Sequence, residues 1–162
     1  MKSLLVVVVL TGAGAMAGVP ESVRAGGVLV GEGRYAEALP MLEEAVRDAR
    51  GHAPALLPDA MNLFARANQG LGRYAIAEEW YRRAIAGYEA MDGRDPRIAV
   101  ALANLLSLHV EQGRPAPGRR IAERLERWTA EQLPVTPDDC RHVLSTLAGF
   151  RVLTGEEDRA EK

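Results

Sequence analysis

The chain has 162 residues, a length that suits one folded domain. Hydrophobic residues make up 48% and charged residues 26%, which excludes a disordered chain. The formal net charge is −2 and no basic stripe runs along the sequence, so we expect no nucleic-acid partner. The single cysteine, Cys140, excludes an intrachain disulfide and a cysteine-based zinc site, and we expect neither metal nor cofactor.

The first residues carry the pattern of an export signal. A positive start at Lys2 precedes the apolar run SLLVVVVL of residues 3–10, and Ala15-Met16-Ala17 has the small-x-small form that signal peptidase cleaves. This predicts a signal peptide over residues 1–17, with cleavage between Ala17 and Gly18, and a periplasmic or secreted mature domain over residues 18–162. The apolar stretch is short for a membrane span, and an uncleaved membrane anchor is the alternative.

The rest of the chain repeats itself at intervals of about forty residues. The segments that begin at Gly33 and Gly72 align well, and weaker copies begin at Gly113 and Gly155, at intervals of 39, 41 and 42 residues. Prolines recur at positions 20, 58, 96 and 137, at intervals of 38, 38 and 41 residues. The repeat predicts units over residues 20–57, 58–95, 96–136 and 137–162, of which the last is incomplete.

Each unit reads as a pair of helices, because alanine, leucine, arginine and glutamate dominate and favour helix. A proline suits the first turn of the first helix, where its missing N–H has no partner to lose. Asp95 and Thr136 are expected to cap the helices that Pro96 and Pro137 open. The glycine after the first helix permits a left-handed turn into the second. We therefore expect an all-α fold.

The second helix of the first two units resembles the tetratricopeptide repeat family, in which an aromatic residue at the turn is followed by regularly spaced small and large residues. The matching positions are Tyr35, Ala38, Leu42, Ala45, Tyr74, Ala77, Tyr81 and Ala84. The long spacing is similar to the kinesin-light-chain-like subclass with roughly 40-residue units. The resemblance implies an α-α superhelix, a solenoid of about three and a half helical hairpins that stack along one axis.

Some residues depart from the family pattern. Gly26, Gly27 and Gly31 in the first helix of the first unit predict a frayed or irregular helix. Pro40 is expected to remove a backbone hydrogen bond and to kink the second helix. In the incomplete fourth unit, Leu144, Leu147 and Phe150 form an apolar face that another copy of the chain is expected to cover.

The resemblance also implies a concave partner-binding groove lined by the first helix of each unit. The family's groove positions fall at Asp59, Asn62, Arg66, Gln69, Val100, Ala103, Ser107, Val110, His142, Ser145 and Val152. The amides of Asn62 and Gln69 are suited to a peptide backbone, and Arg66 to a carboxylate. The alternative is that these residues are ordinary solvated helix surface.

The sequence offers little that resembles a catalytic site. Ser145 and His142 lie three residues apart on one helix, but a hydroxyl there commonly bonds to its own backbone. His109 occupies an apolar helix position and is expected to be a hydrogen-bonded core histidine. We therefore expect a non-catalytic module that binds a protein or peptide. The alternatives are a membrane-anchored structural or regulatory subunit of an envelope complex and a small helical hydrolase.

Overall fold

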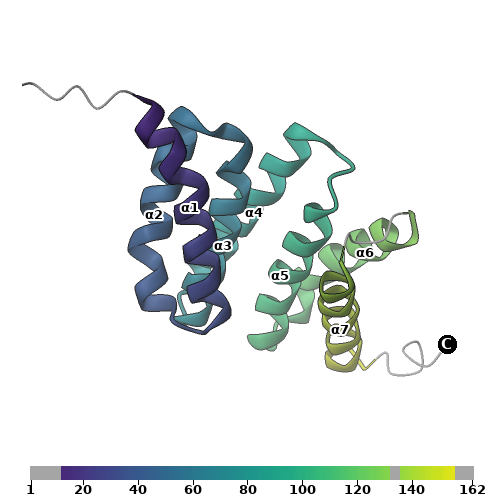
Figure 1. The fold of residues 1–162 in the computed structure, drawn as a ribbon. Helices are drawn as coiled ribbons and strands as arrows, with labels where there is room; N and C mark the ends of the chain where they lie inside the picture. Colours follow the sequence, from purple (N-terminus) through teal and green to yellow (C-terminus); the bar gives the residue numbers. More distant parts are fainter. Residues whose placement is uncertain (1–11, 132–135, 156–162) are drawn as a thin grey trace, which may run out of the picture.

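The computed structural model describes residues 12–131 and 136–155, and side chains from residue 18 onward. Over these ranges the chain forms seven α-helices and one short 3₁₀ helix, with no β-strand (Figure 1). The helices are α1 (Gly12–Gly31), α2 (Tyr35–His52), η1 (Pro54–Leu56), α3 (Leu57–Gly70), α4 (Tyr74–Met91), α5 (Arg97–Glu111), α6 (Pro115–Glu131) and α7 (Pro137–Leu153).

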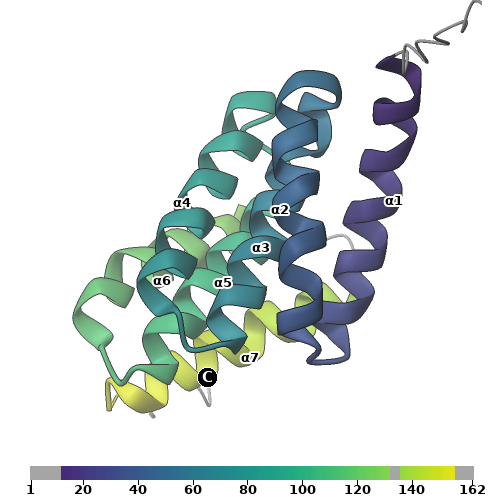
Figure 2. The ribbon, with the colours of Figure 1, turned by 90° about the vertical axis from the view of Figure 1, so that its left-hand side faces the viewer.

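Consecutive helices pair into hairpins, and the hairpins α1–α2, α3–α4 and α5–α6 follow one another with α7 at the end. The hairpins follow one another from left to right in Figure 1 instead of surrounding one centre, and the turned view shows α7 running obliquely to the other helices (Figure 2). One hairpin cannot bury its apolar face alone, so each covers part of its neighbour. The all-α superhelix predicted from the repeat is confirmed.

Glycine makes the sharp turn at the end of each first helix. Gly33, Gly72, Gly113 and Gly155 have φ angles of +74°, +72°, +60° and +72°. This left-handed conformation is disfavoured for a residue with a Cβ atom, which explains why glycine recurs at these four positions. The predicted turns are therefore confirmed in all four units.

Three of the four repeating prolines lie at helix starts. Pro58 is the second residue of α3, Pro96 directly precedes α5, and Pro137 opens α7. The predicted caps also form, because the Thr136 side chain accepts a hydrogen bond from the Asp139 N–H and Asp95 Oδ1 accepts one from the Arg97 N–H at 2.9 Å. The prediction for Pro20 was wrong, since α1 already begins at Gly12 and Pro20 lies inside it.

The first unit is more regular than its glycines predict. Helix α1 is continuous to Gly31, and Gly26 serves packing, because a Cβ atom there would lie 2.5 Å from the Leu42 side chain. The expectation of a frayed helix was therefore wrong. Helix α2 continues through Pro40 to His52.

Small and large side chains alternate in the core. Ala38, Ala77 and Ala84 are fully buried where helices approach closely, while Tyr81 and Tyr88 fill the neighbouring spaces.

His109 on α5 is fully buried as expected, but neither ring nitrogen has a hydrogen-bond partner. The expectation that His109 is hydrogen-bonded was therefore wrong, and its burial lowers its pKa because desolvation disfavours the charged ring.

The last described helix closes the core of the third unit. Leu147 and Phe150 on α7 are each only 6% exposed, and a Cβ atom on Gly118 of α6 would lie 2.7 Å from the Phe150 ring. These two side chains are thus covered within the chain and cannot form the predicted face for a second copy. Leu144 alone of the three is exposed.

None of the described helices has the length and hydropathy that a membrane span requires.

Candidate functional site

A polar cavity lies on the face formed by the first helices of successive units, and we call it the inner cavity. Its volume is about 590 Å³. Of the predicted groove residues, Arg66, Gln69, Ser107 and His142 line it. The lining is completed by Tyr35, Gly70, Gly72, Tyr74, Tyr81, Asn104 and Glu111. The structure therefore gathers predicted residues from α3, α5 and α7 around one space.

Two glycines near the end of α3 bring tyrosines to the inner cavity. A Cβ atom on Gly70 would lie 2.3 Å from the Tyr35 ring, so the ring can pass only because Gly70 has no side chain. The left-handed Gly72 then reverses the chain into α4, which places Tyr74 at the same cavity. Aromatic rings thus wall the cavity at the end where the turns lie.

A hydrogen-bonded chain fixes Gln69 across three helices. The Tyr81 hydroxyl donates to Gln69 Oε1 at 2.7 Å, and Gln69 Nε2 donates to Glu111 Oε1 at 2.7 Å. Ser107 Oγ donates to the same Glu111 oxygen at 3.3 Å. Burial raises the pKa of the Tyr81 hydroxyl, which therefore remains a donor. Gln69 holds the helices together, and both ends of its amide are engaged before any ligand arrives.

A second chain joins equivalent positions on α3, α5 and α7. Asn104 Nδ2 donates to Asn62 Oδ1 at 3.1 Å, and His142 Nε2 lies 2.8 Å from Asn104 Oδ1. Because Asn104 donates through its nitrogen, its oxygen must accept, so the proton of a neutral His142 is on Nε2. Burial and the positive charge of Arg66 lower the pKa of His142, and the neutral ring is the favoured form.

Arg66 differs from its neighbours in the inner cavity. Its side chain is exposed, and no carboxylate among the described residues forms an ion pair with it. Its charge helps to lower the pKa of His142 and opposes the rise that burial causes in the pKa of Tyr81. A guanidinium with its donors still available is suited to a carboxylate or to backbone carbonyl groups.

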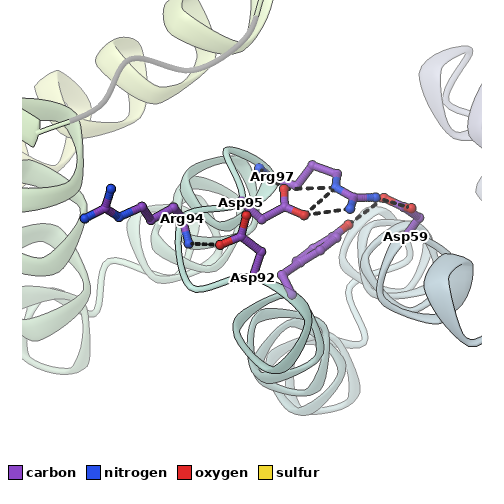
Figure 3. Close-up of polar contacts among 6 residues, drawn as sticks. Asp59, Asp92, Arg94, Asp95 and Arg97 are labelled. Carbon is purple, nitrogen blue, oxygen red and sulfur yellow. Dashed lines mark hydrogen bonds and ion pairs between the residues drawn. The ribbon is translucent and has the colours of Figure 1, made fainter.

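Asp59, a predicted groove residue, lies outside the inner cavity in a separate polar cluster (Figure 3). Arg97 Nη1 donates to Asp59 Oδ2 at 2.7 Å, and Arg97 also forms an ion pair with Asp95 at 2.6 Å. The Tyr88 hydroxyl donates to Asp59 Oδ1 at 2.8 Å. The hydrogen bonds from Arg97 lower the pKa of Asp95. This cluster connects the start of α3 with the start of α5, so the role of Asp59 is explained by the packing of these helices and not by ligand binding.

The remaining predicted groove residues do not line the inner cavity. Ala103 is fully buried, and Val110 is half-buried against the core. Val100 is half-buried and Ser145 is exposed. Val152 is also exposed, near the end of α7. These residues were assigned from the family's groove positions, and the place of a residue in the repeat does not determine how far the neighbouring helices cover it.

The groove assignment also missed Tyr35, Tyr74, Tyr81, Asn104 and Glu111. The tyrosines follow the family spacing and so read as core residues. Asn104 carries a signal in the sequence, because it is an amide within the otherwise apolar stretch of α5. A buried amide requires hydrogen-bond partners, and its partners here are Asn62 and His142.

The side chains of Ser145 and His142 do not form a reactive pair on α7. Ser145 Oγ donates to the main-chain oxygen of His142 at 3.0 Å, as expected for a helical serine, and not to the imidazole ring. Cys140 is half-buried. Within residues 12–131 and 136–155, no three histidine, cysteine or acidic residues are placed to hold a metal ion.

Comparison with known proteins bears on the first half of the chain. Residues 22–90 match the family model of the tetratricopeptide repeat, and the match spans the second half of α1, all of α2 and α3, and nearly all of α4. A search of curated proteins finds no matching relative. Tetratricopeptide repeats commonly mediate protein–protein interactions and are typically non-catalytic.

Proposed function

We propose that this chain is an exported, non-catalytic repeat module that holds a polypeptide segment in the inner cavity, with Arg66 as the group that anchors it. The observation that carries the proposal is the exposed guanidinium of Arg66, which no described carboxylate neutralises, at a cavity of about 590 Å³. The other amide and carboxylate groups at the cavity already bond to one another, which leaves Arg66 as the principal donor for a ligand.

The anchored group is a carboxylate, from an acidic side chain or the end of a chain. A guanidinium offers two parallel N–H donors that match the two oxygens of a carboxylate. The rings of Tyr35 and Tyr74 in the same cavity lining provide apolar contact for a neighbouring side chain of the ligand. The family match supports this assignment, since polypeptides are the usual ligands of such repeats.

Export is the second part of the proposal. Val19, only 1% exposed, is the first buried residue among those whose side chains are described. It lies two positions after Ala17, so cleavage between Ala17 and Gly18 would leave the described core of α1 intact. After that cleavage Pro20 would lie in the first turn of α1, where its missing N–H has no partner to lose.

The 18-residue second helices α2 and α4 also support assignment to the kinesin-light-chain-like subclass.

A displayed library of random peptides tests the binding proposal. Selection on the wild-type protein, with counter-selection on Arg66→Glu, should enrich peptides that carry an acidic residue or a free carboxyl terminus. Binding of these peptides should weaken at least about tenfold in Arg66→Glu and in Ser107→Trp, which fills the cavity. Arg119→Glu on α6 is the matched control. Selected peptides that bind Arg66→Glu as well as wild type would contradict the proposal.

Two further measurements address the alternatives. Mass spectrometry of the protein isolated from its own cells should find Gly18 at the N-terminus, whereas an intact Met1 would favour the membrane-anchored subunit. A hydrolase assay against ester and peptide substrates should show no activity that depends on His142, and such activity would favour the small helical enzyme.

A further inference from the structure

A second cavity lies on the opposite side of α3 from the inner cavity, and the two share no lining residue. It has a volume of about 380 Å³ and lies where α2, α3 and α4 meet. We call it the outer groove, and its apolar floor consists of Val46, Phe64, Ile76 and Trp80. Nothing in the proposed function uses this surface.

The floor of the outer groove is apolar and accessible. Phe64 and Trp80 pack edge to face, with ring centroids 5.0 Å apart and an angle of 69° between the rings. This pair closes the groove against the core, and Ile76 beside it is 43% exposed. An aromatic floor with an exposed aliphatic residue next to it is suited to a bulky apolar side chain.

Arginines surround this floor. Arg47, Arg50 and Arg73 line the groove and are exposed, and the one acidic residue in its lining is Glu43. Among the described residues, none of the three arginines forms a salt bridge. The groove therefore combines an apolar floor with an excess of two positive charges in a chain whose net charge is −2.

The groove of the next unit shows that such arginines need not be left unpaired, because its lining also has three arginines and one glutamate. An equivalent groove of about 320 Å³ lies between α4, α5 and α6, where Ile85 takes the place that Val46 has one repeat earlier. Two of these arginines, Arg82 and Arg124, are paired with Glu78 and Glu89 respectively, and only Arg120 of the three forms no salt bridge among the described residues. Thirty-nine residues after Arg50 the chain has Glu89, so the repeat tolerates either charge at this position. Three unpaired arginines are thus particular to the outer groove.

The geometry points to the outer groove as a second docking site, which binds an acidic segment of a partner protein with one bulky apolar side chain on Phe64 and Trp80 and its carboxylates against Arg47, Arg50 and Arg73. Charge complementarity selects this occupant, because guanidinium groups around an apolar floor are neutralised by carboxylates that flank the anchor. The module would then hold one segment on each side of α3.

A fluorescein-labelled amphipathic peptide, with leucines on one helical face and glutamates on the other, is the probe. Fluorescence anisotropy with the purified protein should show saturable binding that weakens as salt is added. The double variant Arg47→Glu/Arg50→Glu should weaken binding at least about tenfold, and Ile76→Ser should weaken it several-fold. A peptide with lysine in place of glutamate should not bind.

The controls separate this site from the inner cavity. Arg119→Glu/Arg120→Glu makes the same change in net charge on α6, where Arg120 lines the neighbouring groove, and should leave binding unchanged. Arg66→Glu should also leave it unchanged, so the two proposals fail separately. Circular dichroism should show that each variant melts as a folded helical protein.

Three results would overturn the inference. The first is equal affinity of wild type and Arg47→Glu/Arg50→Glu for the glutamate peptide, or no binding at all. The second is loss of binding in Arg66→Glu alone, which would place the peptide in the inner cavity. The third is sedimentation of the protein with phosphatidylglycerol vesicles, dependent on Arg47 and Arg50, without binding to the peptide.

Discussion

Nε2 of His142 on α7 lies 2.8 Å from Oδ1 of Asn104 on α5. Asn104 in turn donates to Asn62 on α3, so three successive first helices are joined by side chains that lie 42 and 38 residues apart. The chain runs beside Arg66 and keeps the wall of the inner cavity in one arrangement. A wall that is already ordered reduces the conformational entropy that a ligand must remove on binding.

Replacing His142 with leucine should destabilise the protein by about 1–3 kcal/mol, because Asn104 Oδ1 would then be buried without a donor. His142→Gln is the matched variant, since its amide nitrogen can still donate to Asn104. Urea denaturation followed by circular dichroism should rank the proteins as wild type, glutamine and leucine, in order of falling stability. Equal stability of the leucine variant would show that the bond contributes little.

The inner cavity should link ligand binding to the protonation of His142. In the unliganded protein its pKa lies below the ordinary value of 6.5, because burial and Arg66 disfavour the charged ring. The folded state then binds this proton less readily than the unfolded state, so the contribution of His142 to stability is complete above pH 6.5 and declines as the pH falls through the lowered pKa.

A carboxylate on Arg66 would offset that positive charge and should raise the pKa of His142. Two-dimensional NMR of the imidazole groups, titrated with and without a selected peptide, measures this change. His52, an exposed residue of α2 away from the cavity, serves as the internal reference. A His142 pKa that does not move at saturating peptide would argue against a carboxylate at Arg66.

The cluster around Arg97 predicts a loss of stability in acid. The pKa of Asp95 is lowered, chiefly by hydrogen bonds from Arg97, so this contribution is present above the ordinary pKa and is lost as the pH falls through the lowered value. Asp95→Asn keeps an acceptor for the Arg97 N–H but removes the charge. It should cost about 1 kcal/mol near neutral pH and almost nothing in strong acid.

Urea denaturation at several pH values tests this prediction. Asp138→Asn is the control, because Asp138 pairs with Arg141 one turn later and its side chain is 84% exposed. A difference between wild type and Asp95→Asn that is constant from neutral pH to strong acid would mean that the charge of Asp95 is not responsible.

The sequence predicts the features that depend on local backbone chemistry. Gly72 must adopt a positive φ angle, and Thr136 can cap only the helix that follows it, so residue type and position alone indicate both. The helical period likewise predicts the burial of Leu102 and Leu106. These features account for the fold class and the order of the helices.

The inner cavity was only partly predictable, because its lining depends on contacts between residues about forty positions apart. Gln69 was expected to bond a peptide backbone, yet Tyr81 and Glu111 already engage both ends of its amide. Ala103 was placed on the groove, and the packing of neighbouring helices buries it instead. Such pairings follow from the stacking of units, which no single helix specifies.

The two glycines at the end of α3 should respond to alanine for different reasons. Gly72→Ala forces a residue with a Cβ atom to adopt a φ angle of +72° and should cost about 1 kcal/mol. Gly70→Ala places its Cβ atom 2.3 Å from the Tyr35 ring, and the resulting overpacking should cost about 1–3 kcal/mol. Gly51→Ala, on α2 with no neighbour within 4 Å, should be neutral or slightly stabilising.

A second substitution separates the two causes, because only the Gly70 effect depends on the Tyr35 ring. Tyr35→Ala should therefore offset part of the loss in Gly70→Ala and none of the loss in Gly72→Ala, a double-mutant cycle that urea denaturation can resolve. Because Tyr35 lines the inner cavity, Gly70→Ala should also weaken the binding of selected peptides, whereas Gly51→Ala should not. Additive effects of Gly70→Ala and Tyr35→Ala would mean that the ring yields to the new methyl group without cost, and the close approach of α2 to α3 would then not depend on glycine.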